Sequence, residues 1–150
     1  MRFDLLGLTV ACDRPLPGAV APPSSILDVR VEEAIGSPAR PARWVGENDW
    51  PRIALDSRAA TLWFDDDAVF VLDPDARAIR YHLLCGLDDA TFGHELVDHV
   101  LPRYVSMLGR HVIHGSAVAG RAGAVVFVGR DHARDFVRSV IGSIVDPSAG

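Results

Sequence analysis

The residues after Gly129 stand where a phosphate-binding loop would begin, but their types cannot perform that chemistry. A Walker loop needs a glycine-rich path of backbone N–H groups, a lysine for the β- and γ-phosphates and a hydroxyl side chain for magnesium. Counted from Gly129, the two later glycine positions hold His132 and Arg134. The lysine position holds Asp135 and the hydroxyl position holds Phe136, and all 15 basic residues of the chain are arginines. An aspartate at the lysine position repels polyphosphate, so the sequence predicts weak or no binding of ATP in this manner.

Two strands are expected to lead into this segment. They cover residues 111–119 and 124–129, around a turn at residues 120–123. The second is a continuous apolar run between glycines, which is typical of a strand buried on both faces. Residues 135–145 then predict an amphipathic helix. We expect Phe136, on its apolar stripe, to turn inward and fill the former loop site.

A longer helix is predicted before these strands, over residues 92–108. Its apolar residues repeat every four positions and are Phe92, Leu96, Val100, Tyr104 and Leu108. Thr91 is expected to cap its N-terminus and Gly109 to end it. Pro102 lies inside the run, so the helix either kinks there or is two shorter helices.

The front of the chain predicts short strands. They are expected at residues 3–11, 26–32, 52–55, 60–64, 68–72 and 78–84. Aspartate-rich segments at residues 65–67 and 73–76 are expected as turns, because aspartate bonds nearby backbone N–H groups. The fold class that follows is α+β, with a β-rich antiparallel front portion at residues 1–90 and a partial α/β core at residues 91–150.

Composition narrows the classes of partner. The 150 residues, 49% of them hydrophobic, suffice for one domain with a core, or for a small domain and a truncated second one. A formal net charge of −5 argues against a nucleic-acid partner.

No signal peptide or membrane span is recognisable, so the cytoplasm is the expected location, with a small-molecule or protein partner. Cys12 and Cys85 have no metal-like spacing and are expected to be buried free thiols.

A predicted helix with Leu101-Pro102 and Leu108-Gly109-Arg110 is followed by the strand Val112-Ile113-His114-Gly115-Ser116-Ala117-Val118 and then by the apolar strand at residues 123–129. This order of motifs gives residues 97–129 a resemblance to the HPr kinase/phosphorylase family. It implies an ATP-dependent kinase core, shared with phosphoenolpyruvate carboxykinases. By this resemblance Gly129 would open the nucleotide loop and His114 would match a family histidine near the ligand.

Since the loop chemistry is lost, we interpret the chain as a degenerate relative. It would be a non-catalytic module that binds a peptide or protein, with no catalytic residue and no cofactor. The alternative is an ATP-dependent Ser/Thr phosphotransferase acting on a peptide or protein, with ATP and magnesium, completed by a partner chain. A third interpretation is a structural domain that forms homo-oligomers.

Histidines and acids elsewhere in the chain lack the spacing of a metal or catalytic site. His94 and His99 are five apart, so on an α-helix they diverge by about 140° and cannot share a zinc ion from one face. His111 and His114 would point to opposite faces of a strand, and Ser116 has no local base to activate it. Residues 65–67 are expected to be solvated acids. No metal site is predicted.

Three tryptophans suggest a different kind of site. Trp44, Trp50 and Trp63, with Arg40 and Arg43 nearby, could form a stacking surface for a peptide or a base. The competing interpretation is that the tryptophans anchor the core of a small β-rich domain.

Because of Arg134, Asp135 and Phe136, titration calorimetry of the chain with Mg-ATP should show weak binding or none. A micromolar dissociation constant, about −8 kcal/mol, would contradict this prediction.

Overall fold

The computed structural model describes residues 1–45, 50–56, 58–113, 115–120 and 123–128. Two compact units divide the chain, Met1–Arg110 and His111–Gly150. Segment 91–150 is therefore shared between the units: its helix lies in the first and its strands lie in the second.

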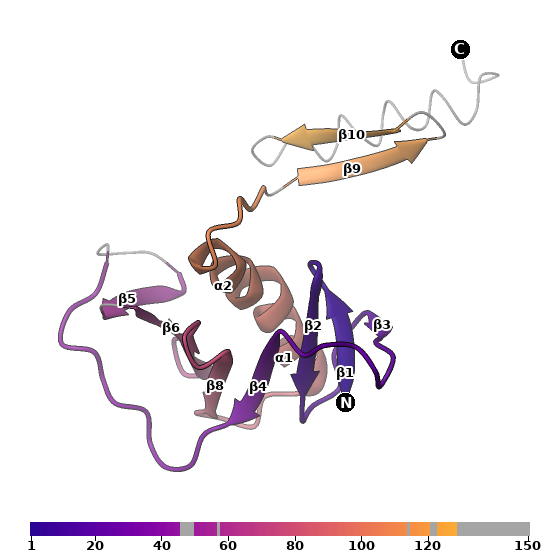
Figure 1. Ribbon diagram of the computed structural model, residues 1–150. Helices are drawn as coiled ribbons and strands as arrows, with labels where there is room; N and C mark the ends of the chain where they lie inside the picture. Colours follow the sequence, from indigo (N-terminus) through magenta and orange to yellow (C-terminus); the bar gives the residue numbers. More distant parts are fainter. Residues whose placement is uncertain (46–49, 57, 114, 121–122, 129–150) are drawn as a thin grey trace. The chain divides into compact units, whose positions relative to one another are not determined.

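The first unit is built on an eight-stranded sheet (Figure 1). Its strands are β1 (Arg2–Leu5), β2 (Leu8–Cys12), β3 (Ala19–Val20), β4 (Val29–Glu33), β5 (Arg52–Asp56), β6 (Ala59–Phe64), β7 (Ala68–Asp73) and β8 (Ala78–Leu83). Their order across the sheet is β3-β1-β2-β4-β8-β7-β6-β5. With the helical segment described below, this confirms the α+β class.

Strands β5 to β8 form the predicted antiparallel meander. The aspartate turns between them act as expected. The Asp73 carboxylate accepts a hydrogen bond from the Ala76 N–H at 2.9 Å. Between β6 and β7 the Asp67 N–H donates to the Phe64 carbonyl at 2.8 Å. These local bonds close the turns, and the Leu84 N–H adds a bond to the Asp67 carbonyl at 2.9 Å from the end of β8.

Two expectations for the front portion were wrong. The sheet is mixed, because β4 pairs in parallel with both β2 and β8. The connections that flank β4 are long enough to cross the sheet, whereas a tight hairpin would force antiparallel pairing. In addition, the strand expected at residues 3–11 is a hairpin of β1 and β2. Its turn residues Leu6 and Gly7 have φ of 52° and 72°, the left-handed conformation of a tight hairpin turn.

A helical segment covers one face of this sheet (Figure 1). It consists of α1 (Asp89–His94), the π-helical turn η1 (Glu95–Val100) and α2 (Leu101–Met107). The expected stripe is buried from Phe92 to Tyr104, while Leu108 is exposed at its end. Across the sheet, Leu62 and Phe64 of β6 and Tyr81 of β8 belong to the same core. Gly109 follows with φ of 77°, which confirms it as the stop.

The cap of this segment is Asp88, not the expected Thr91. The Asp88 carboxylate accepts hydrogen bonds from the backbone N–H groups of Ala90 and Thr91 at 2.9 and 3.0 Å. The Thr91 hydroxyl also donates to it, at 2.9 Å. Because these bonds favour the ionised form, they lower the pKa of Asp88. The carboxylate of Asp88, three residues before Thr91, therefore caps the helix in place of the Thr91 hydroxyl.

The π turn explains how Pro102 is accommodated. The Leu101 N–H donates to the Leu96 carbonyl, five residues back. Pro102 follows in the first turn of α2, where its missing N–H costs least. The predicted break at Pro102 is thus a change of helical register directly before it.

In the second unit, β9 (Gly115–Gly120) pairs antiparallel with β10 (Gly123–Val128). The two strands expected from the sequence are present, but β9 begins at Gly115, so the expected start at residue 111 was wrong and residues 111–113 precede the strand. His114, Gly129, Phe136 and the helix expected at residues 135–145 lie outside the described residues. Among the helices that the structure describes, none is long and apolar enough to cross a membrane.

Shortening a buried side chain of the apolar stripe should lower the stability of the first unit. Leu96 is fully buried, so we expect Leu96→Ala to lower the free energy of unfolding by about 2–5 kcal/mol. Leu55 is 66% exposed, so Leu55→Ala should cost less than about 0.5 kcal/mol. Urea unfolding followed by tryptophan fluorescence measures both, because all three tryptophans lie in the first unit. A loss below about 1 kcal/mol for Leu96→Ala would contradict the packing described.

Candidate functional site

A hollow of about 520 Å³ lies on the sheet near β5 and β6. We call it the Arg–Trp hollow, and its lining residues are Arg40, Arg52, Trp63, Asp65, Asp66 and Leu84. Arg52 lies on the edge strand β5, and Trp63 lies near the end of β6. Asp65 and Asp66 belong to the turn after β6, while Arg40 and Leu84 lie in loops.

The sheet register directs this lining away from the helical segment. Leu62 and Phe64, which flank Trp63 on β6, are fully buried in the core beneath the helices. Because successive side chains of a strand point to opposite faces, Trp63 projects to the other side. Arg52 pairs with Trp63 across β5 and β6 and so shares its face. The hollow therefore occupies the sheet face that the helical segment leaves open.

Aromatic contacts hold the arginine in place. The rings of Trp44 and Trp63 meet edge to face, with centroids 6.0 Å apart. The Arg52 guanidinium carbon lies 5.0 Å from the centroid of Trp44, a cation–π contact. The Trp63 indole N–H donates to the Asp65 carbonyl at 2.8 Å. The Arg52 Nε–H is buried and has no hydrogen-bond partner among the described residues.

Four formally charged side chains line the hollow. Arg40 and Arg52 supply two guanidinium groups, and Asp65 and Asp66 supply two carboxylates. The ion pairs found within 4.0 Å in the described part of the chain involve other residues. These groups can bind a ligand that carries both signs of charge, with Trp63 and Leu84 offering apolar surface beside them.

The tryptophan prediction is only partly met. The structure brings together Trp44, Trp63 and Arg40, while Arg43 is exposed and outside the lining. Trp50 lies elsewhere, edge-on to Phe64 at 5.3 Å. Sequence reasoning missed Arg52, whose place beside Trp63 depends on pairing between strands.

The π turn changes the geometry of the two histidines. The rings of His94 and His99 lie 5.6 Å apart between centroids, at 86°. The expected divergence was wrong because each residue of a turn that closes five residues back advances through a smaller angle, which brings residues five apart nearer to the same side. His94 Nδ1 lies 2.7 Å from a carboxylate oxygen of Asp98, and His99 packs edge-on to Trp50 at 5.2 Å. Within the described residues, no group of three or more His, Cys, Asp or Glu side chains is placed to hold a metal ion.

On the inner side of the same turn lies a buried carboxyl group. Glu95 is 2% exposed, and its Oε2 has no hydrogen-bond partner among the described residues. Burial, followed by the negative charge of Asp67, raises the pKa of Glu95 to about 7.

Cys85 lies nearby and its thiol donates to the Asp67 carboxylate at 3.6 Å. Desolvation and this bond raise the pKa of Cys85.

The two cysteines differ in burial. Cys12 is buried as expected, and burial raises its pKa to about 11. Cys85 was expected to be buried but is exposed, because it follows the end of β8 in a loop.

A second polar cluster joins the sheet to the start of α1. The buried Tyr81 hydroxyl donates to Asp13 at 2.9 Å, and burial raises the pKa of Tyr81. Arg14 lies 4.7 Å from the ring centroid of Phe92 and donates to Asp89 at 2.7 Å. These contacts fix the helix against the sheet, while the buried Nη1 of Arg14 has no hydrogen-bond partner among the described residues.

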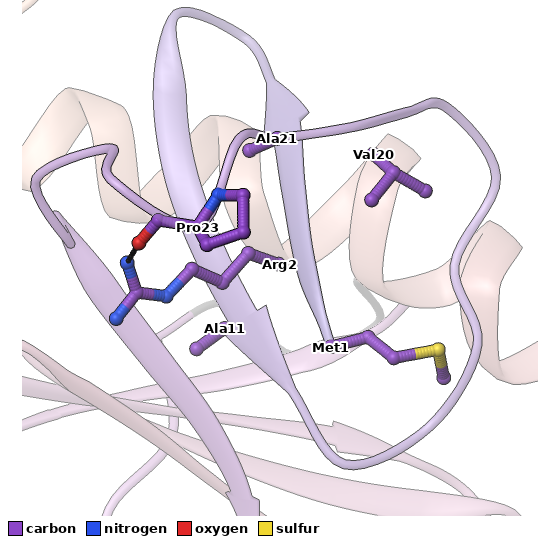
Figure 2. A pocket seen from close by; sticks show the side chains of 6 residues that line it. All are labelled: Met1, Arg2, Ala11, Val20, Ala21 and Pro23. Carbon is purple, nitrogen blue, oxygen red and sulfur yellow. Dashed lines mark hydrogen bonds between the residues drawn. The ribbon is translucent and has the colours of Figure 1, made fainter.

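Figure 2 shows a second hollow, of about 500 Å³, beside β1 and β3. Its lining is Met1, Arg2, Ala11, Val20, Ala21 and Pro23. The Arg2 guanidinium donates to the carbonyls of Pro23 and Ser25 at 2.7 and 2.8 Å. Since its charged group is engaged in tying down the loop, this hollow offers mainly aliphatic surface.

The structure does not describe the side chains of the residues predicted from the family resemblance. His114 and Gly129 lie outside the described residues, and Ser116 is described only through its backbone, which pairs with Phe127 in the β9–β10 hairpin. Comparisons with models of protein families, with curated protein sequences and with solved structures found no match. The resemblance to HPr kinases therefore stays a prediction from the sequence.

Glu95 predicts a pH-dependent stability. Its pKa in the folded chain, about 7, exceeds the ordinary 4.5, so folding favours the protonated form. The free energy of unfolding should fall as pH rises from about 4.5 to about 7 and then level off. Glu95→Gln should remove this loss. The change that the substitution causes in the free energy of unfolding should therefore be more favourable at pH 8 than at pH 4, by up to roughly 3 kcal/mol.

Urea unfolding at a series of pH values measures this dependence. Asp98→Asn, on the exposed side of the same turn, is the matched control and should keep the fall in stability. An equal pH slope in the natural chain and in Glu95→Gln would show that Glu95 is not the group responsible.

Proposed function

We propose that the chain is a non-catalytic module that binds an extended peptide segment of a protein partner in the Arg–Trp hollow. One observation carries the proposal: two guanidinium groups and two carboxylates face one hollow without pairing with each other. Charged groups left apart on a shared concave surface favour a ligand that supplies the opposite charges.

A peptide fits this chemistry better than a uniformly charged ligand. An acidic side chain can accept paired hydrogen bonds from Arg40 or Arg52, because guanidinium and carboxylate geometries match. A basic side chain can approach Asp65 and Asp66, and an apolar side chain can cover Trp63 and Leu84. Because Trp44 and Trp63 already hold Arg52 in place, little side-chain freedom is lost on binding.

The sequence supports the same proposal independently. The resemblance to HPr kinases implies an ancestor that acted on a protein, and the replaced loop residues argue against phosphoryl transfer by this chain. The alternative, a phosphotransferase using ATP and magnesium from a site completed by a partner, rests on that resemblance alone.

Selection of a displayed library of random peptides on the full chain tests the proposal. We expect enriched peptides that combine acidic and basic residues, with micromolar affinity by calorimetry and weaker binding at higher salt, since exposed charges are screened. Trp63→Ala and Arg52→Gln should each weaken binding about tenfold or more, a loss of about 1.4 kcal/mol.

Arg30→Gln is the matched control, because Arg30 is an exposed arginine of β4 outside the lining. It should bind the selected peptides like the natural chain. Peptides that bind equally well to Arg52→Gln and Asp66→Asn, or a library without enrichment, would refute the proposal.

A further inference from the structure

The turn between β6 and β7 contributes two of its three aspartates to the Arg–Trp hollow. Asp65 and Asp66 line the hollow, and the carbonyl of Asp65 accepts the Trp63 indole N–H at 2.8 Å. Asp67, the next residue, instead accepts the thiol hydrogen of Cys85, with 3.6 Å between the sulfur and the carboxylate oxygen. One short turn therefore carries the carboxylates of the hollow and also contacts residues outside it.

The backbone of this turn is strained and depends on bonds at its last residue. Asp65 has a φ of 39°, in the left-handed region that residues other than glycine seldom adopt. The Asp67 N–H donates to the Phe64 carbonyl at 2.8 Å, and the Asp67 carbonyl accepts the Leu84 N–H at 2.9 Å. A strained conformation persists only where its surroundings hold it, so weakening the bonds at Asp67 should displace the two carboxylates of the hollow.

A buried acid of the helical segment lies within electrostatic reach of Asp67. Glu95 is 2% exposed, and its Oε2 has no hydrogen-bond partner in the described part of the chain. Burial, followed by the charge of Asp67, raises the pKa of Glu95 to about 7. When Glu95 ionises, two negative charges therefore stand close together where little water screens them, and their repulsion is strong.

Other titratable groups near Glu95 come from two elements. The loop after β8 presents Cys85, which interacts electrostatically with Glu95. The helical segment itself adds neighbours in sequence, namely His94, Asp98 and His99. His94 and Asp98 pair with each other at 2.7 Å. The ion pairs found within 4.0 Å among the residues that the structure describes do not include Glu95, so none of them offsets its charge.

We propose that Glu95 makes the Arg–Trp hollow sensitive to pH: protonated Glu95 leaves the β6–β7 turn in place, and ionised Glu95 repels Asp67 and displaces the carboxylates of the hollow. This regulation rests on the proposed peptide binding, whereas the movement of the turn does not. Peptide binding should weaken as the pH rises through about 7, because the protonated form is the competent one. A basic side chain of the peptide favours ionised Glu95, but water and salt screen that charge at the surface.

NMR titration of the isotope-labelled chain from pH 6 to pH 8 tests the movement of the turn without a ligand. The Trp63 indole N–H signal reports on the turn, because this group donates to the Asp65 carbonyl. We expect the signal to shift with a midpoint near pH 7, and the shift should be absent in Glu95→Gln, whose side chain stays neutral. His82→Gln is the matched control for a histidine of the sheet, and it should keep the shift.

Peptide affinity is then measured on the same variants with a histidine-free peptide selected from the library. The natural chain should bind it about fivefold or more weakly at pH 8 than at pH 6, whereas Glu95→Gln should bind it equally at both. If no peptide is selected, the proposed function fails and the Trp63 titration alone decides whether the turn responds to Glu95. A Trp63 signal without a shift near pH 7, the same shift in Glu95→Gln, or an affinity that is constant or rises toward pH 8 would overturn the proposal.

Discussion

The packing of one apolar stripe on one face of the sheet governs the arrangement of the first unit. Phe92, Leu96, Val100 and Tyr104 repeat every four residues and are all fully buried. In a regular α-helix this spacing drifts by about 40° per repeat, and the stripe would leave the sheet. A π turn between two α-helical turns offsets the drift, because each residue of it advances through a smaller angle. The same turn sends Glu95 inward and brings His94 and His99 together outside.

The two faces of the sheet consequently differ in what they can do. On the helix side, aromatic rings interlock, with Tyr81 and Phe92 at 4.7 Å and Phe70 and Phe92 at 5.7 Å between centroids. Such a face is closed to ligands. On the open side, charged and aromatic residues of the meander meet in the Arg–Trp hollow. The face proposed for binding is therefore separate from the face that packs the core.

Features coded by neighbouring residues could be predicted from the sequence. The meander, its aspartate turns, the buried stripe and the Gly109 stop follow from local patterns. The parallel pairing of β4 and the place of Arg52 beside Trp63 depend on contacts between distant segments, which no local pattern specifies. The Leu6–Gly7 turn was missed because the apolar run on both sides concealed it. A four-residue spacing is also typical of an ordinary α-helix, so the sequence indicates neither the π turn nor the proximity of His94 and His99.

The register of the helical segment is the most direct test of this account. Scalar couplings across hydrogen bonds, measured by NMR on the isotope-labelled chain, identify the carbonyl that accepts each backbone N–H. The account predicts a coupling between the Leu101 nitrogen and the Leu96 carbonyl carbon, the bond that closes the π turn. A coupling from the Leu101 nitrogen to the Val97 carbonyl carbon would show a regular α-helix and contradict the account.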